Sequence, residues 1–247
     1  MPILAHETLT RLRAVSTATL TTQLFKRGLR NCFMQGVQPL NPGHWGHWNR
    51  LAHNLVGPAF TLRNIPARED IDHVGVFANP EHPQRRAIEI TPEGHVLVLD
   101  CRGDTLAASA GQILITRLMK RGVAGFVSDG GVRDAGPIGE MAFPVFCSGP
   151  SAPLNLARHH AVETNVPIGC GGVAVYPGDV IVGDRDGVVV VPRGIADEVA
   201  RDGAEQEELE NFLLERIEAG AALPGTYPPN DATKAAFELW RKDRPKP

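Results

Sequence analysis

Residues 166–192, VPIGCGGVAVYPGDVIVGDRDGVVVVP, constrain the fold of this chain more than any other segment. Runs of valine and isoleucine, which favour strands, are separated there by a Pro-Gly-Asp turn and an Asp-Arg-Asp-Gly turn. The runs follow one another too closely for crossover helices, so they predict packed hairpins and not an all-parallel doubly wound sheet. This pattern favours a mixed α/β layered domain, with strands in two groups and helices on one side.

Residues 111–134, GQILITRLMKRGVAGFVSDGGVRD, predict a helix followed by a short strand. Apolar residues recur at helical spacing up to Gly122, and the strand is expected over residues 125–128. Two glycines and the adjacent charges Arg133 and Asp134 follow. One interpretation is structural: Asp134 N-caps the next short helix and Arg133 is a solvated neighbour. The other is functional: Arg133 holds a carboxylate and Asp134 holds a metal ion.

The rest of the chain reads as one domain over residues 1–247, with a core of about residues 16–220 and a Pro-rich tail over 221–247. Residues 4–28 predict one or two helices, with Ser16 as an N-cap for the second. Residues 70–91 predict a helix and a polar loop. Residues 94–104 predict a strand that ends in the acidic loop residues Asp100 and Asp104, which are expected to support a nearby pocket as polar residues. Residues 196–218 predict a long acidic amphipathic helix, and the tail is expected to embrace a neighbouring subunit.

Composition excludes several functions. A net charge of −3, with lysines and arginines scattered, argues against a nucleic-acid partner. No apolar stretch approaches the ~18 residues that a membrane span needs. No GxGxxG or GxxxxGK[ST] motif supports a nucleotide site. The four cysteines are widely spaced, which favours reduced thiols in a cytoplasmic protein.

Other polar residues have weaker claims to a function. His44 and His47 could bind a metal, but their Trp-rich loop is more typical of a packed loop or an interface. His159 and His160 are expected on a helix at the surface. Asp179, Asp184 and Asp186 read as turn residues. Cys147 and Cys170 read as small buried hydrophobic residues.

The segments GQIL…RGVAGFVSDGGVRD and PGDVIVGDRDGVVVVP resemble the RraA-like family over roughly residues 16–220. That family includes class II pyruvate aldolases acting on 4-hydroxy-4-methyl-2-oxoglutarate, which also decarboxylate oxaloacetate. It also includes proteins named as regulators of ribonuclease E activity. The resemblance implies a swivelling β/β/α layered domain with N-terminal helices and a long C-terminal helix. It further implies a homotrimer or hexamer with sites between subunits.

The resemblance also implies roles for individual residues. In the aldolases the arginine of the motif grips the pyruvyl end of the substrate, and the adjoining aspartate ligates Mg²⁺ or Mn²⁺. Backbone amides at the helix start close over the same ligand. These roles fall on Arg133 and Asp134 and on the substrate-binding stretch Gly111, Gln112, Ile113 and Leu114.

The chain departs from the family pattern at two places. Gln112 stands where the family commonly has an acidic residue, and Thr22-Gln23 stand where members often have an aspartate. Both departures leave the metal site with less negative charge. A further acidic ligand, acting through water, is expected from the C-terminal helix of a neighbour, with Glu207 and Glu210 as candidates.

The chemistry explains why a lyase of this type needs these residues. Cleaving a bond beta to a keto group leaves an enolate, which a hard cation on a carboxylate stabilises as a Lewis acid. A guanidinium adds charge-assisted hydrogen bonds to the same atoms, and no Schiff-base lysine is required. We therefore predict a metal-dependent lyase that releases pyruvate from a 4-hydroxy-2-oxo acid or decarboxylates oxaloacetate. The alternative is a non-catalytic protein that binds and regulates an RNA-processing enzyme, which the acidic helix would suit.

Overall fold

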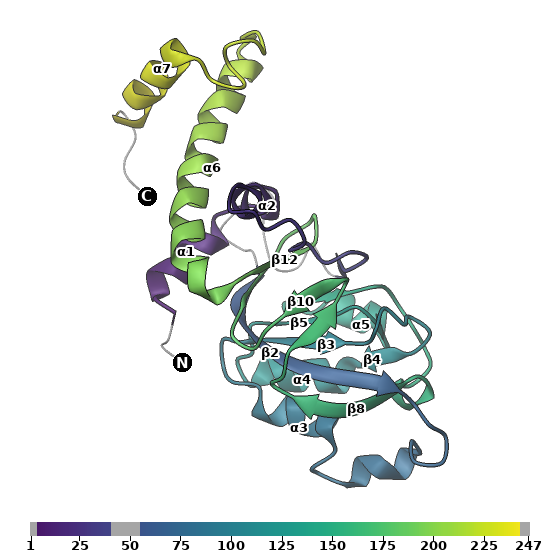
Figure 1. Cartoon of the computed structure of the whole chain (residues 1–247). Helices are drawn as coiled ribbons and strands as arrows, with labels where there is room; N and C mark the ends of the chain where they lie inside the picture. Colours follow the sequence, from purple (N-terminus) through teal and green to yellow (C-terminus); the bar gives the residue numbers. More distant parts are fainter. Residues whose placement is uncertain (1–3, 41–54, 243–247) are drawn as a thin grey trace.

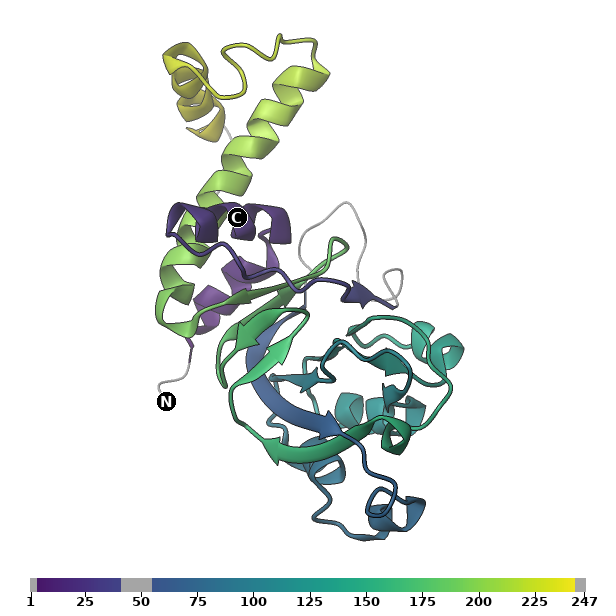
Figure 2. The same ribbon diagram turned by 45° about the vertical axis from the view of Figure 1, so that its right-hand side comes forward.

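The computed structural model of the protein describes residues 4–40 and 55–242 and has a strongly curved mixed sheet at its centre (Figures 1 and 2). Its strands are parallel in the middle and antiparallel towards the ends, with β8 beside β2. In spatial order they are β1 (Gln38–Pro39), β7 (Val145–Cys147), β5 (Gly125–Ser128), β3 (Val96–Asp100), β2 (Leu55–Pro66), β11 (Val180–Gly183) and β12 (Val188–Val191), with β8 (His159–Thr164) off this path.

The segment that constrains the fold forms the predicted hairpins. β11 and β12 pair antiparallel across the Asp-Arg-Asp-Gly turn, and β9 (Ile168–Cys170) pairs antiparallel with β10 (Val173–Val175). The crossover helices that a doubly wound sheet requires are absent from this described segment, as the short turns predict. The mixed α/β class is confirmed.

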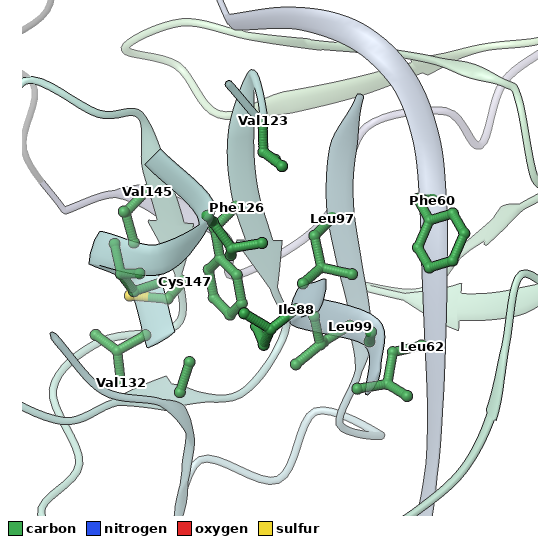
Figure 3. Packing of buried hydrophobic residues seen from close by; sticks show 14 of the residues in the cluster. Phe60, Leu62, Ile88, Leu97, Leu99, Val123, Phe126, Val132, Val145 and Cys147 are labelled. Carbon is green, nitrogen blue, oxygen red and sulfur yellow. The ribbon is translucent and has the colours of Figure 1, made fainter. Parts of the chain in front are cut away.

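Strand β3 explains how the layers are built, because it is buried on both faces. Leu97 and Leu99 belong to an apolar cluster with the helices, whereas Val96 and Val98 belong to a cluster with the hairpin strands. Successive side chains of a strand point to opposite faces, so one strand supplies both cores. Figure 3 shows Leu97 and Leu99 beside Phe126 of β5 and Ile88 of the covering helix layer. The helices of this layer are α3 (Pro83–Ile90), α4 (Gln112–Lys120) and α5 (Ala135–Gly139).

The N-terminal helices pack against the long C-terminal helix in a third cluster. These are α1 (His6–Arg13), α2 (Thr17–Lys26) and α6 (Ala196–Glu218). Ser16 caps α2 as predicted, since its Oγ accepts a hydrogen bond from the Thr19 amide at 3.1 Å. Glu207 of α6 in turn accepts from the Ser16 amide at 2.8 Å, which ties the two helices together.

The Pro-rich tail folds back onto the far end of α6. Helix α7 (Asp231–Lys242) packs there through Phe237 and Trp240 against Phe212, with ring centroids 5.5 to 5.9 Å apart. Figure 1 shows α7 beside the end of α6 that is remote from the sheet. Within the described residues, every helix is too short or too polar to cross a membrane.

One local prediction is wrong. His159 and His160 lie on strand β8 and not on a helix, and His159 is buried. Buried and half-buried residues alternate along His159–Val162, as they do in a strand. Four residues of mixed composition are too few for this alternation to be recognised in the sequence.

Candidate active site

A short parallel pair of strands joins the two halves of the predicted site. Strand β4 (Ala108–Ala110) pairs with β6 (Gly131–Val132), and the Arg133 amide donates to the Ala110 carbonyl at 2.9 Å. Parallel strands end at the same edge, so the residues that follow each strand emerge side by side. Gly111–Leu114 and Arg133–Asp134 are therefore neighbours in space, as the family resemblance implies.

The two glycines before the charged pair are required by close packing. A Cβ at Gly130 would lie 2.8 Å from the Cys101 Cβ, and one at Gly131 would lie 2.5 Å from the Ser151 Cβ. Such contacts are shorter than side chains tolerate without a shift of the backbone. The tight, Cβ-poor approach expected at this position is present.

Asp134 is held in an unusual backbone conformation that points its carboxylate at helix α4. Its φ is +56°, a left-handed value that aspartate adopts more readily than most residues. Its side chain makes no cap hydrogen bond to α5 and instead accepts from the Gln112 amide through Oδ2 at 3.1 Å. The N-cap interpretation is therefore wrong for α5, and the negative charge lies at the N-terminus of α4.

A cavity of about 210 Å³ opens over this corner. Of the predicted residues, Gly111, Ile113, Leu114, Arg133 and Asp134 line it, whereas Gln112 contributes its backbone amide and exposes its side chain. The remaining described lining residues are Phe77, Gln84, Arg85, Ala108, Ala110, Leu154 and Asn155. The volume lies below the usual range for drug-sized ligands and suits a small acid.

The cavity wall formed by η1 (Val74–Ala78) and α3 is the part that sequence reasoning missed. The Arg85 guanidinium carbon lies 4.1 Å from the centroid of the Phe77 ring, a cation–π contact. Gln84 Nε2 donates to the Ser109 carbonyl at 2.7 Å and so fastens α3 to strand β4. The sequence carries one signal of this wall, the pair Arg85-Arg86 at the start of an amphipathic helix. Nothing in the local sequence indicates that Arg85 lines the same cavity as Arg133.

Asp134 offers a ligand of the type that Mg²⁺ prefers. Its Oδ2 accepts one backbone hydrogen bond, and its Oδ1 has no partner among the described residues. Mg²⁺ in proteins is commonly bound through one or two carboxylates while it keeps several waters. The described residues contain no group of three His, Cys, Asp or Glu that could cage a metal ion. The residues present therefore fit a largely hydrated hard cation on a single carboxylate.

A second, larger hollow of about 760 Å³ lies beside Asp100 and Asp129. Asp129 is buried, and its carboxylate accepts from the amides of Cys101 and Gly103 at 2.6 and 2.9 Å, which identifies a structural role. Burial raises the pKa of Asp100. Asp104 instead pairs with Arg158 at 2.8 Å. Neither Asp100 nor Asp104 lines the Arg133 cavity, so a supporting role for them would not involve direct contact with a ligand there.

The candidate glutamates of α6 already have partners within the chain. Glu207 accepts from Ser16, and Glu210 accepts from Gln206 Nε2 at 2.8 Å. Gln23, one of the two residues at which the resemblance implies a departure from the family pattern, is buried and donates to the Gln206 side chain at 2.7 Å. Figure 1 shows α6 and α2 beyond the β12 end of the sheet, away from α3 and α4. A role of Glu207 or Glu210 at the site therefore requires a neighbouring subunit.

The remaining candidates are structural or lie outside the described residues. Cys147 and Cys170 are buried, and burial raises the pKa of both thiols. Asp179 and Asp184 accept backbone hydrogen bonds at turns, from Tyr176 and Asp186 respectively. His44 and His47 fall in residues 41–54, which are not described.

Comparisons with known proteins show to which family the chain belongs. The RraA-like family profile, described as Aldolase/RraA, matches residues 17–190. A Halalkalibacterium halodurans protein provisionally named 4-hydroxy-4-methyl-2-oxoglutarate aldolase is 32% identical over 208 residues, covering 84% of this chain and 87% of that protein. Streptomyces coelicolor RraAS2, described as an unusual member of the RNase ES inhibitor RraA protein family, has a TM-score of 0.72 at 30% identity over 86% of this chain and 98% of its own. An uncharacterised protein of Pseudomonas syringae has a TM-score of 0.74 at 25% identity, covering 92% of this chain and all of that one. With a matching profile over most of its length and relatives of this similarity, the chain belongs to the RraA-like family.

Proposed function

We propose that this protein is a divalent-metal-dependent lyase that cleaves a 4-hydroxy-2-oxo acid into pyruvate and a carbonyl product, or decarboxylates oxaloacetate. One observation carries the proposal: the Arg133 guanidinium and the Asp134 carboxylate line one small cavity at the N-terminus of α4. A cation, an anion and helix-start amides in one cavity are the groups that a 2-oxo acid and its metal need. The aldolase name of the H. halodurans relative supports the same reaction class.

Asp134 would hold Mg²⁺ or Mn²⁺, and the ion when bound supplies positive charge beside the 2-oxo oxygen of the substrate. Arg133 binds the 1-carboxylate, for which its planar fork of donors is suited. Its side chain has no hydrogen-bond or ionic partner in the part of the chain that the structure describes, so the guanidinium is available. The Ile113 amide, in the first turn of α4, adds a donor for the same anion.

A Schiff-base route lacks its nucleophile at this site. None of the described residues that line the cavity is a lysine. The apolar side chains of Phe77, Leu114 and Leu154 instead line part of the cavity and limit the access of water to the reacting carbons. The proposed chemistry is therefore of the class II type. In this type a bound metal ion and a cationic side chain, and not a covalent amine, stabilise the negative charge that develops as the carbon–carbon bond breaks.

The decisive experiment measures pyruvate released from 4-hydroxy-4-methyl-2-oxoglutarate and from oxaloacetate. The purified protein is assayed after exhaustive treatment with EDTA and again after addition of Mg²⁺ or Mn²⁺. We expect no activity after chelation and recovery with either ion. Incubation with pyruvate and borohydride should add no mass to the protein, because no imine forms. Full activity without metal would exclude the class II assignment.

The alternative, a non-catalytic regulator of an RNA-processing enzyme, has support from the name of the S. coelicolor relative. The acidic face of α6 offers this role little surface, since Glu207 and Glu210 bond within the chain and Glu208 pairs with Arg241 at 3.1 Å. Metal-loaded protein that releases pyruvate from neither substrate would favour the regulator over the lyase.

A further inference from the structure

A second guanidinium in the cavity has no negative partner among the residues that the structure describes. Arg85 lines the same cavity as Arg133, and no carboxylate in the part of the chain that the structure describes pairs with it. Its neighbour Arg86 differs in this respect, because Arg86 lies within 3.4 Å of Glu81. The charged side chains among the described lining residues are thus two arginines and one aspartate, which leaves an excess of positive charge.

Packing holds Arg85 in place. Its guanidinium lies over the Phe77 ring at 4.1 Å, and the His82 ring meets the same phenylalanine edge-on, with centroids 5.2 Å apart. The adjacent Gln84 ties the first turn of α3 to strand β4, which leads directly into Gly111. A side chain stacked and anchored in this way loses little further freedom when it binds an anion.

The position of Arg85 is unfavourable for an isolated cation. The residue is half-buried, and burial lowers the pKa of its guanidinium. A desolvated charge is costly unless an opposite charge or a ligand compensates it. The described lining residues supply no carboxylate that pairs with Arg85, and an anion that enters the cavity would supply that charge.

We infer that Arg85 binds the carboxylate at the far end of the substrate and makes the cavity selective for 2-oxo acids that carry a second carboxylate. The inference rests on the proposed function, which assigns the first carboxylate to Arg133. A substrate with a carboxylate at each end satisfies both guanidiniums. A monoacid of the same length would leave Arg85 desolvated and facing a methyl group, which lowers its affinity.

A matched pair of substrates isolates this contact. Retro-aldol cleavage of 4-hydroxy-2-oxoglutarate breaks the C3–C4 bond, the electron pair passes to C3, the 4-hydroxyl loses its proton, and C3 gains one. The products are pyruvate and glyoxylate. The same step on 4-hydroxy-2-oxopentanoate gives pyruvate and acetaldehyde, so the two substrates differ only by a carboxylate in place of a methyl group.

The test compares Arg85→Met and Arg85→Lys with the wild type, and Arg86→Met is the matched control one residue along the same helix. We expect Arg85→Met to lower kcat/KM for the diacid by roughly 10- to 100-fold, mainly through KM, the range for a charge-assisted hydrogen bond. The monoacid should change less than about twofold, the size of a neutral surface change. Arg85→Lys should restore part of the selectivity, and Arg86→Met should behave as the wild type. Thermal unfolding of each variant checks its fold.

A binding measurement separates this inference from the proposed function. Isothermal titration of 2-oxoglutarate and 2-oxopentanoate, neither of which has a 4-hydroxyl to cleave, measures the preference for the diacid without catalysis. Loss of that preference in Arg85→Met supports the role of Arg85 even if the wild type cleaves nothing. An equal ratio of the two affinities in the wild type and in folded Arg85→Met overturns the inference, and so does a wild type that binds neither acid. Either result leaves lyase activity to be judged by pyruvate release.

Discussion

The backbone amide of Gln112 donates a hydrogen bond to Oδ2 of Asp134 at 3.1 Å, across 22 positions of sequence. Through this contact the carboxylate compensates an unpaired donor at the N-terminus of α4 while its second oxygen faces away from that bond. Asp134 therefore caps the N-terminus of α4 although it lies far from that helix in the sequence. The proposed metal site and this cap use the same side chain, and substitutions can separate the two roles.

Gly111→Ala should disturb this corner without unfolding the protein. An added Cβ would lie 2.9 Å from Asp134 Oδ2, so the carboxylate has to move. We expect a roughly 10- to 100-fold loss of lyase activity, the size of effect that a small misplacement of a reacting group produces. The control is Gly136→Ala, whose Cβ would meet nothing within 4 Å. Comparable losses of activity in both variants would contradict the explanation.

Asp134→Asn should remove the anchor for the metal ion. The amide oxygen can still accept from Gln112, so the fold and helix α4 should persist. Activity should fall by about 10²-fold or more and recover in part at high metal concentration. Titration of Mn²⁺ into the wild type, Asp134→Asn and the control Glu140→Gln checks this, because Glu140 is an exposed carboxylate just beyond α5. Equal affinities in all three proteins would mean that Asp134 is a cap and nothing more.

Arg133→Lys tests the geometry of the grip and not its charge. Lysine keeps the positive charge but lacks the planar fork that binds a carboxylate through two parallel hydrogen bonds. We expect KM for the 2-oxo acid to rise and kcat to fall, with an unchanged melting temperature, because the Arg133 side chain is exposed. Steady-state kinetics on oxaloacetate give both constants. A variant with wild-type constants would exclude a direct contact between Arg133 and the substrate.

We expect a homotrimer or a dimer of trimers in solution. The tail and the end of α6 leave Leu214, Leu223 and Leu239 more than half exposed, which a single chain does not bury. A second subunit is also needed if a glutamate of α6 is to reach a site. Sedimentation velocity at micromolar concentration measures the mass directly. A monomer there would remove the basis for a shared site.

Acid should destabilise the fold more than surface titration alone predicts. Burial lowers the pKa of both His82 and His159, so the unfolded chain binds protons that the native chain excludes. The free energy of unfolding then falls as the pH drops through about 6.5, the unfolded value, towards the lowered native values. Urea unfolding between pH 7.5 and 5.5 measures this slope. His159→Gln should flatten it, and His6→Gln, at an exposed position of α1, is the matched control.

Elements with a strong local signal were predictable almost to the residue. The strand over Gly125–Ser128 and the helix over Ala196–Glu218 have the expected bounds, and the helix expected to start at Gly111 begins one residue later, at Gln112. For both helices the apolar periodicity agrees with the helix-breaking residues at the boundaries: Gly111 and Gly122 flank one helix, and Pro192 precedes the other. The family resemblance implies that Arg133 and Asp134 lie beside Gly111. The structure gives the physical reason: strands β4 and β6, which end there, are parallel neighbours.

Contacts made by tertiary pairing were not predictable in this way. Phe77 and Arg85 line the cavity from a segment that Gln84 fastens to Ser109, a contact that spans 25 positions and leaves no pattern in the sequence. The structural interpretation of Asp134 as a cap of the next helix fails for the same reason: a short helix directly follows it, and the more distant Gln112 is the residue that it contacts. His159 was misassigned because its strand is defined by pairing with the far half of β2 and not by its own composition.

Helix α6 contributes to two apolar clusters that share no other element. Its first turns pack with α1 and α2, and its last turns hold α7 through Phe212 and Leu213. An uninterrupted helix of 23 residues spans about 34 Å, so its length sets the distance between the sheet and the C-terminal cluster. This distance depends on the number of residues in the helix. One residue inserted after Gln206 would advance the C-terminal cluster by about 1.5 Å and turn it by about 100° around the axis, and a seven-residue insertion would move it outward by about two turns with nearly the same face presented.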